Sequence, residues 1–332
     1  MTAPANPTAP PKLTMAKALN DGMRKAMEDD PKVVIMGEDV GKLGGVFRIT
    51  DGLQKDFGEA RVIDTPLAES AIIGTAVGLA IRGYRPVCEI QFDGFVFPGF
   101  DQIVSQVAKF HNRSAGLVKM PITIRIPSGG GIGAVEHHSE SVETYFAHTA
   151  GLKVVACSDP SDAYWMIQEA IADDDPVIFI EPKRLYHAAK AEIAEAPTPL
   201  YRARVSRPGR HVTVVGYGPT MPTLLDAAKT ASEDGIELEV IDLRSVSPLD
   251  IPTVVTSVEK TGRLIVVHEA PQSFGVGAEI AARVTEQAFY SLEAPVLRVT
   301  GYDTPYPPSR LEHEWLPNLD RVLDAVDKIM EY

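Results

Sequence analysis

The feature that most constrains the fold is a repeated alternation of short apolar runs with stretches of helical period. Runs such as Val33 to Met36 and Ile122 to Ile126 have the length and composition of buried strands. Between such runs lie segments with helical spacing, among them 98–113 and 161–172. Strands that alternate with helices predict a mostly parallel sheet with helices on both faces. We therefore expect an α/β protein.

Length and a change of composition divide the chain. It has 332 residues, which is long for one domain and comfortable for two. Residues 188–210 are rich in Ala, Glu, Pro and Arg with little periodicity, which indicates a linker or an extended crossing segment. A second α/β series follows them. We expect a disordered tail at 1–12, a first domain at 13–187, a linker at 188–210 and a smaller α/β domain at 211–332.

Charge and hydropathy exclude two classes of partner. The net charge is −13, and an acidic chain repels phosphate backbones, so we expect no nucleic acid partner. The most apolar run, 71–81, is too short to cross a bilayer, and the N-terminus has no secretory signal. We therefore expect a cytoplasmic protein without membrane contact. Cys88 and Cys157 form no C-x-x-C pair, and both are expected to be buried thiols.

Glu69 is the first candidate for chemistry. It lies in the first turn of a helix expected to open at Pro66 and to be otherwise apolar. A carboxylate in a first turn is commonly stabilised by the helix dipole alone. In a buried setting, however, a carboxyl group kept protonated can donate a hydrogen bond to a ring nitrogen. Gly74 and Gly78 give the same helix a flat strip that suits close approach of another backbone, as at a subunit contact.

A glycine-rich loop followed by two histidines is the second candidate. The loop at 128–133 matches neither common phosphate-binding pattern. His137 and His138 suit proton transfer near neutral pH, although hydrogen-bonded loop residues explain them equally well. Adjacent histidines on a helix cannot both face one metal ion, which makes a zinc site a poor interpretation.

Two further segments are open to two interpretations each. The aromatic segment 91–100 carries four phenylalanines, which can wall a flat ligand or belong to the core. The acidic run 173–175 can bind a cation or form a solvated turn. The chain has no hydrolase, metalloprotease or Walker motif, and no Gly-Asp-Gly followed by a distant Asn, the pattern that holds Mg²⁺ and diphosphate in thiamine-diphosphate enzymes.

Several segments, in this order, resemble the β subunits of the E1 component of 2-oxo acid dehydrogenase complexes. They lie at 34–40, 64–69, 100–104, 136–139, 146–155 and 239–244, and the resemblance covers about 13–332. It implies a transketolase-like fold, with a pyrimidine-binding domain and a smaller C-terminal α/β domain, in an α₂β₂ heterotetramer. In this family the E1 α subunit binds Mg²⁺ and the diphosphate of thiamine diphosphate, and the β subunit binds the aminopyrimidine. That division explains the missing Gly-Asp-Gly motif.

The resemblance also implies cofactor-binding roles. Glu69 matches the catalytic glutamate that hydrogen-bonds the pyrimidine N1′, and Leu67 matches a residue whose backbone touches the cofactor. Gln91 and Phe95 match the wall of the pyrimidine site. Relatives often carry Tyr at the position of Phe95, so stacking is kept here and any role of a hydroxyl is lost.

Acyl transfer and a structural ion are implied in the same way. His138 matches the catalytic histidine that serves acyl transfer to the lipoyl arm of the E2 acyltransferase, and His137 is a neighbour without an established role. The C-terminal domain is expected to support β–β contact and to dock E2. Five backbone carbonyls match a structural K⁺ site, those of Met120, Ile122, Ala170, Asp173 and Asp175.

The resemblance extends to a branch of the family. Segments 181–186, 268–271 and 301–307 resemble the branched-chain enzymes, which implies oxidative decarboxylation of acids such as 3-methyl-2-oxobutanoate with transfer of the acyl group to lipoyl-E2. Three alternatives stay open. They are a pyruvate dehydrogenase E1 β subunit, a non-catalytic scaffold that joins an α chain to E2, and a fragment of a single-chain transketolase-like enzyme.

Overall fold

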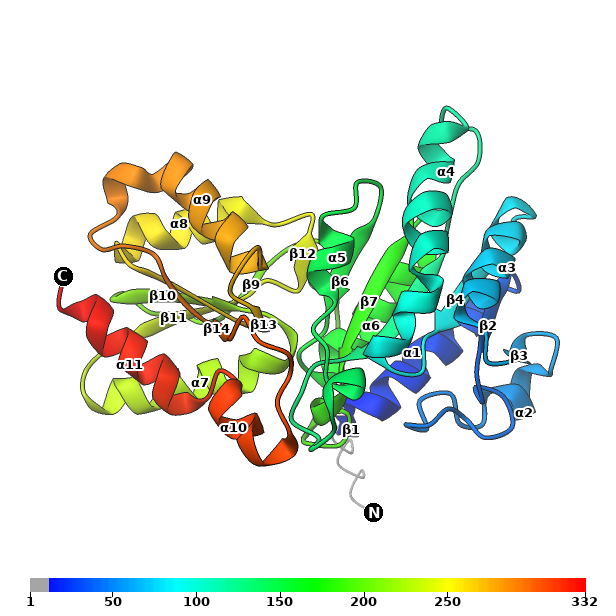
Figure 1. Ribbon diagram of the computed structural model, residues 1–332, viewed down its shortest axis with the longest axis horizontal. Helices are drawn as coiled ribbons and strands as arrows, with labels where there is room; N and C mark the ends of the chain where they lie inside the picture. Colours follow the sequence, from blue (N-terminus) through cyan, green and yellow to red (C-terminus); the bar gives the residue numbers. More distant parts are fainter. Residues whose placement is uncertain (1–11) are drawn as a thin grey trace, which may run out of the picture.

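The computed structural model describes residues 12–332, and nearly all of the tail expected at 1–12 lies outside them. Two β-sheets, each flanked by helices, lie side by side, the first on the right of Figure 1 and the second on the left. A short antiparallel pair, β1 (Leu13–Thr14) with β8 (Lys190–Ala191), adds a third sheet among the described residues. The expected two-part α/β architecture is confirmed.

The first sheet is parallel except at one edge. In spatial order its strands are β12 (Ser245–Ser247), β6 (Lys153–Ala156), β7 (Val177–Pro182), β5 (Thr123–Ser128), β4 (Arg85–Glu89), β2 (Val33–Gly37) and β3 (Val62–Asp64). The edge strand β12 runs antiparallel to β6, and it comes from the second half of the chain. The second half therefore completes the first sheet as well as forming its own.

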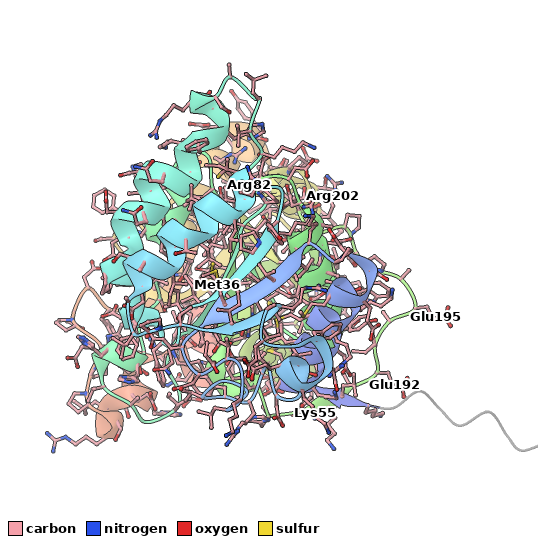
Figure 2. All side chains as sticks on the ribbon, turned by 90° about the vertical axis from the view of Figure 1, so that its right-hand side faces the viewer. Met36, Lys55, Arg82, Glu192, Glu195 and Arg202 are labelled. Carbon is pink, nitrogen blue, oxygen red and sulfur yellow. The ribbon has the colours of Figure 1, made fainter. Side chains whose placement is uncertain are left out.

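Helices cover both faces of the first sheet because alternate strand residues point to opposite sides. Ile35, Val87 and Phe179 pack toward α1 (Met15–Asp29) and α6 (Pro160–Ala172), whereas Met36 and Ile124 pack toward the other face. That other face carries α3 (Glu69–Ile81) and α4 (Ala108–Arg113). Figure 2 shows it, with Arg82 at the end of α3 and Met36 in the sheet behind.

The helix expected over 98–113 is not one regular α-helix. It begins within a 3₁₀ segment, η1 (Asp93–Gly99), passes through a π-helical segment, η2 (Gln102–Val107), and ends as α4. The apolar spacing identified a helix correctly but could not reveal its winding, which depends on local packing. Irregular winding of this kind is frequent at functional sites.

The second sheet has the spatial order β14 (Leu297–Gly301), β13 (Leu264–Pro271), β10 (Val212–Gly216), β11 (Leu238–Asp242) and β9 (Arg204–Arg207). Only β9 is antiparallel to its neighbour, and it lies within the extended segment expected at 188–210. The longer helices of this half are α7 (Met221–Glu233), α8 (Ile251–Thr261), α9 (Val276–Ala288) and α11 (Leu319–Met330).

Short elements fill the connections and the chain ends. They are α2 (Leu53–Phe57), η3 (Glu136–His138), α5 (Glu143–Ala147), η4 (Lys183–Leu185), η5 (Gly218–Thr220), η6 (Phe289–Ser291), η7 (Ser309–Leu311) and α10 (Glu312–Trp315). The described residues contain no helix long and apolar enough to cross a membrane. Cys88 and Cys157 are free and buried, as expected.

One of the apolar clusters of the core is shared by the two halves. A single cluster of buried side chains contains Ile126 of the first sheet together with Tyr217 and Val246 of the second half. Beside it, the fully buried Arg244 donates from Nε to Asp162 of α6 at 3.0 Å and from Nη1 to the Pro199 carbonyl at 2.9 Å. The two halves are therefore packed as one unit, and side chains of the second half contact the first sheet and its helices.

Candidate active site

Glu69 begins α3, where the backbone N–H groups of Ala71 and Ile72 donate to the Ala68 carbonyl. The expected start at Pro66 is wrong, because these first helical bonds leave Pro66 and Leu67 in the preceding loop. Leu67 is 77% exposed, whereas Glu69 is only 6% exposed. A mostly exposed loop thus leads directly into a buried carboxyl group.

A second buried carboxyl group lies beside Glu69. Glu38, just after β2, is 7% exposed, and its Oε1 is buried without a hydrogen-bond partner in the described chain. Burial raises the pKa of Glu38, and the nearby charge of Glu69 raises it further. An unpaired buried oxygen is costly and calls for an explanation, such as a ligand or a partner that supplies the missing donor. Glu38 lies in segment 34–40, which carries the family resemblance, but no role was predicted for it.

The segment η1 links the Glu69 region to η3 (Glu136–His138), the histidine turn. A Cβ placed on Gly99, at the end of η1, would lie 3.3 Å from the Glu69 carbonyl. A Cβ on Gly94, at its start, would lie 2.5 Å from the His137 carbonyl. Both contacts are to backbone atoms. A side chain at Gly94 would force the backbone of His137 to move, whereas Gly99 marks a close but less restrictive approach to Glu69. Phe95 lies on this segment, and the half-buried Gln91 lies two residues before its start.

His138 packs among aromatic rings of the same segment. Its ring centroid is 4.1 Å from that of Phe92 and 5.4 Å from that of Phe95, both in edge-to-face arrangements. The ring of His137 is 6.3 Å from Phe95. Burial lowers the pKa of His138, and the positive charges of His137 and Lys183 lower it further. Its neutral imidazole is therefore favoured, the form that accepts a proton.

A buried ion pair supports this turn. Asp93 of η1 and Lys183 of η4 have fully buried side chains, and Lys183 Nζ donates to Asp93 Oδ2. Asp93 also accepts from its neighbour, the Gly94 N–H, at 2.9 Å, and from the backbone of Glu140, which follows the histidine turn. Burial raises the pKa of Asp93 to about 6 and lowers the pKa of Lys183, while each group partly offsets the shift of the other. Asp93 thus ties η1, η4 and the histidine turn together.

A second buried charge network lies in the neighbouring strands. Arg125 on β5 donates to Glu89 on β4 at 2.6 Å and to both carboxylate oxygens of Glu181 on β7 at 2.6 and 2.9 Å. Tyr186 donates to Glu181 at 2.6 Å. Sequence reasoning missed this network and the Asp93–Lys183 pair. The signal was available, since a charged residue inside an apolar strand is rarely buried without a partner.

The carbonyls expected to hold K⁺ lie at the opposite end of β5 from the histidine turn. Arg85 donates there to the carbonyls of Ile171 and Ala172 at 3.2 Å and to that of Asp173 at 3.0 Å. Each carboxylate of the acidic run has a basic partner, Lys153 for Asp173, Arg85 and Lys119 for Asp174, His111 and Lys153 for Asp175. No group of three metal-ligating side chains occurs in residues 12–332. The K⁺ site therefore stays a prediction.

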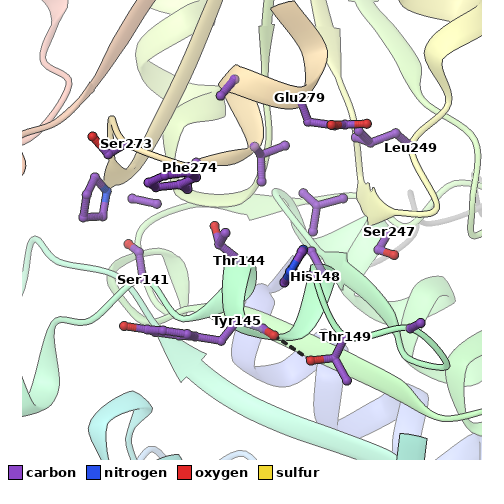
Figure 3. Close-up of a pocket in the computed structure, with 18 of the residues that line it drawn as sticks. Ser141, Thr144, Tyr145, His148, Thr149, Ser247, Leu249, Ser273, Phe274 and Glu279 are labelled. Carbon is purple, nitrogen blue, oxygen red and sulfur yellow. Dashed lines mark hydrogen bonds between the residues drawn. The ribbon is translucent and has the colours of Figure 1, made fainter. Parts of the chain in front are cut away.

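A cleft of about 1240 Å³ opens between the two halves. Figure 3 shows Tyr145 on one side of it and Phe274 on the other. Phe274 is 90% exposed and has a left-handed backbone conformation, with φ at 58°. Glu140 also lines the cleft, two residues after His138, but neither Glu69 nor His138 does. The cleft therefore adjoins the array of Glu69, Phe95 and His138 without containing it.

Comparison with known proteins assigns this arrangement to a family. Residues 11–188 match the transketolase pyrimidine-binding domain, and residues 201–322 match the transketolase C-terminal domain. The chain is 60% identical over 321 residues to a pyruvate dehydrogenase E1 component subunit beta of Leifsonia xyli subsp. xyli, with 96% of this chain and 95% of the relative covered. The chain belongs to the E1 β-subunit family of 2-oxo acid dehydrogenases.

Other relatives in the E1 β family carry a different substrate name. A 3-methyl-2-oxobutanoate dehydrogenase subunit beta of Mycobacterium tuberculosis is 56% identical over 320 residues, with 96% of this chain and 92% of the relative covered. Among solved structures, a split-gene transketolase described as an inactive β4 tetramer superposes with a TM-score of 0.81 at 21% identity, covering 97% of this chain and 99% of that one. This last similarity confirms the transketolase-like fold.

Proposed function

We propose that this E1 β subunit supplies the aminopyrimidine half of a thiamine-diphosphate site, and that it does so together with an α chain. One observation carries the proposal. Glu69, Phe95 and His138, assigned from separate segments of the sequence, are brought together along η1. The unpaired Glu38 oxygen at the same place fits a ligand that brings hydrogen-bond donors.

Each side chain has a defined task in this proposal. Glu69 hydrogen-bonds the ring nitrogen N1′ of the pyrimidine, and its burial excludes water from that bond. Leu67 contacts the cofactor through its backbone, while Gln91 and Phe95 wall the ring. When bound, thiamine diphosphate supplies the nucleophilic carbon and the electron sink for decarboxylation. His138, held neutral in its aromatic setting, handles the proton during transfer of the acyl group to the lipoyl dithiolane of E2.

The exposed side of α3 supports the need for an α chain. A Cβ on Gly78 would meet nothing within 4 Å, and one on Gly74 would meet only Gln102 Oε1 at 3.6 Å. Ile81 is 46% exposed, and Ala71 and Thr75 are exposed on the same helix. Small residues in a helix face permit close approach of another backbone. In our proposal this strip packs against the α chain, which holds Mg²⁺ and the diphosphate, in an α₂β₂ heterotetramer.

For the substrate we propose a branched-chain 2-oxo acid such as 3-methyl-2-oxobutanoate. Three segments suggested this branch, 181–186, 268–271 and 301–307. Glu269 and Tyr306 from two of them contact the loop that precedes the histidines, and Lys183 from the other pairs with Asp93 on η1. The relative named as a 3-methyl-2-oxobutanoate dehydrogenase favours the same substrate. Pyruvate is the second candidate, favoured by the 60% identical relative.

The test compares kcat/KM for 3-methyl-2-oxobutanoate and pyruvate. It uses this chain co-purified with its α chain, thiamine diphosphate and Mg²⁺, with an artificial electron acceptor. A clear preference for the branched acid supports the proposal, and a preference for pyruvate keeps the mechanism and overturns the branch. An assembled tetramer that turns over neither acid would instead favour a non-catalytic scaffold between an α chain and E2.

A further inference from the structure

The loop that precedes the histidines is held by the second half of the chain. This histidine loop, residues 128–138, leaves β5 at Ser128 and reaches His138 in η3. Gly129, Gly131 and Gly133 have φ angles of +84°, +88° and +72°, which side chains rarely adopt. Successive N–H groups in such a conformation can converge on one anion. Here the anions are side chains of the same protein.

Glu312, the first residue of α10, supplies one of these anions. The Gly131 N–H donates to its Oε1 at 2.9 Å, and the Gly133 N–H donates to its Oε2 at 3.1 Å. The Tyr306 hydroxyl donates to the same Oε1 at 2.5 Å and also lies 3.3 Å from the Gly131 nitrogen. One carboxylate therefore bridges two N–H groups of the histidine loop, and a tyrosine fixes the carboxylate.

A second carboxylate holds the preceding residue. The Gly130 N–H donates to Glu269 Oε2 at 3.1 Å, and the other oxygen of Glu269 accepts from Arg184. A Cβ on Gly130 would lie 1.9 Å from the Tyr306 hydroxyl, so the loop backbone is in direct contact with these side chains. Tyr306 is itself buried against Trp315, with ring centroids 4.8 Å apart. Of the residues that hold the loop, Glu269 lies in β13, Tyr306 follows β14, and Glu312 begins α10.

We infer that Glu312 and Tyr306 are positioning residues that set the place of His138 from the C-terminal domain. The inference rests on the proposed role of His138 in acyl transfer. Neither residue lies in the array of Glu69, Phe95 and His138, so both act through the histidine loop. The Glu69 end of η1 has separate contacts with α3. Loss of the hydrogen bonds from Glu312 and Tyr306 to the histidine loop should therefore impair transfer to the lipoyl arm far more than decarboxylation.

The experiment uses the α₂β₂ heterotetramer with lipoyl-E2 and measures two rates. One is decarboxylation coupled to an artificial electron acceptor, and the other is reductive acylation of E2. Glu312→Gln keeps only one acceptor oxygen for two N–H groups. Since small misplacements of a catalytic group cost up to ~10²-fold, we expect a fall of about tenfold or more in kcat for acylation, with KM for lipoyl-E2 little changed. Decarboxylation should stay within about twofold.

Controls separate positioning from general damage. Glu314→Gln changes an exposed carboxylate of the same short helix and should leave both rates unchanged. Tyr306→Phe, which leaves the carboxylate in place, should give a smaller acylation defect than Glu312→Gln. Hydrogen exchange at Gly131 and Gly133 gives a readout independent of turnover, and it should be faster in Glu312→Gln than in wild type, without thiamine diphosphate as well as with it.

Three outcomes would overturn the inference. Unchanged exchange at the loop, unchanged acylation, or equal losses in both rates would each show that the contacts do not position His138. The proposed function fails separately, namely if the wild-type tetramer turns over no 2-oxo acid, or if His138→Ala lowers decarboxylation as much as acylation.

Discussion

Removing the charge of Asp93 tests the buried ion pair under the histidine turn. Both side chains of the Asp93–Lys183 pair are fully buried. Breaking a buried pair by removing one partner leaves an uncompensated charge and costs about 3–5 kcal/mol. Asp93→Asn retains an acceptor for the Gly94 and Glu140 N–H groups, so the loss should come mainly from the isolated Lys183. We expect the free energy of unfolding to fall by about this amount.

The matched variants are Lys183→Met and the double variant Asp93→Asn/Lys183→Met. The double variant has no buried charge to leave unpaired, so it should recover most of the loss seen in Asp93→Asn. The assay is urea unfolding followed by circular dichroism, at pH 7 and one fixed chain concentration. The reasoning is refuted if Asp93→Asn is within about 1 kcal/mol of wild type, or if the double variant is no more stable than Asp93→Asn.

Two further predictions concern assembly and acid stability. Gly78→Leu should leave the isolated chain at least as stable as wild type, because glycine is a poor helix former and the space beside it is empty. The same substitution should weaken association with the α chain, measured by size-exclusion chromatography. Undiminished association would contradict the proposed interface. Burial lowers the pKa of His268 to about 4 from an ordinary 6.5, so its stabilising contribution is complete above pH 6.5 and is lost as pH falls toward 4. His268→Phe should therefore flatten the urea midpoint over that range, whereas His313→Phe, at an exposed position, should keep the wild-type slope.

The repeating pattern predicted most of the fold because the central strands of both sheets are short and buried. The run at 33–36 lies in β2, and the helical spacing at 161–172 lies in α6, which begins one residue earlier, at Pro160, and is capped by the Asp159 side chain. The strand at 245–247 was not predicted. It pairs with β6 of the first sheet, where the Ser245 hydroxyl donates to the Val154 carbonyl, 91 residues away in sequence. Local periodicity cannot encode such a distant pairing.

For the candidate site, the sequence predicted the residues, and the structure supplied their arrangement. Glu69 and His138 were assigned through family resemblance, and no spacing rule relates residues so far apart. Their connection through η1 involves close backbone approaches at Gly94 and Gly99, which appear only in three dimensions. The contact of Glu312 with the histidine loop could not be predicted. A glutamate in a short C-terminal segment carries no local signal for a partner 181 residues away.

The most direct test of the central claim is turnover by Glu69→Gln in the assembled heterotetramer with thiamine diphosphate and Mg²⁺. The substitution keeps size and one acceptor oxygen and removes the ionisable group at the buried start of α3. We predict intact assembly and a fall in decarboxylation of about a hundredfold or more, the scale of a lost acid–base contribution. Glu233→Gln, at the exposed end of α7, should turn over like wild type. Undiminished turnover by Glu69→Gln would contradict the assignment of this carboxyl group and, with it, the proposed half-site.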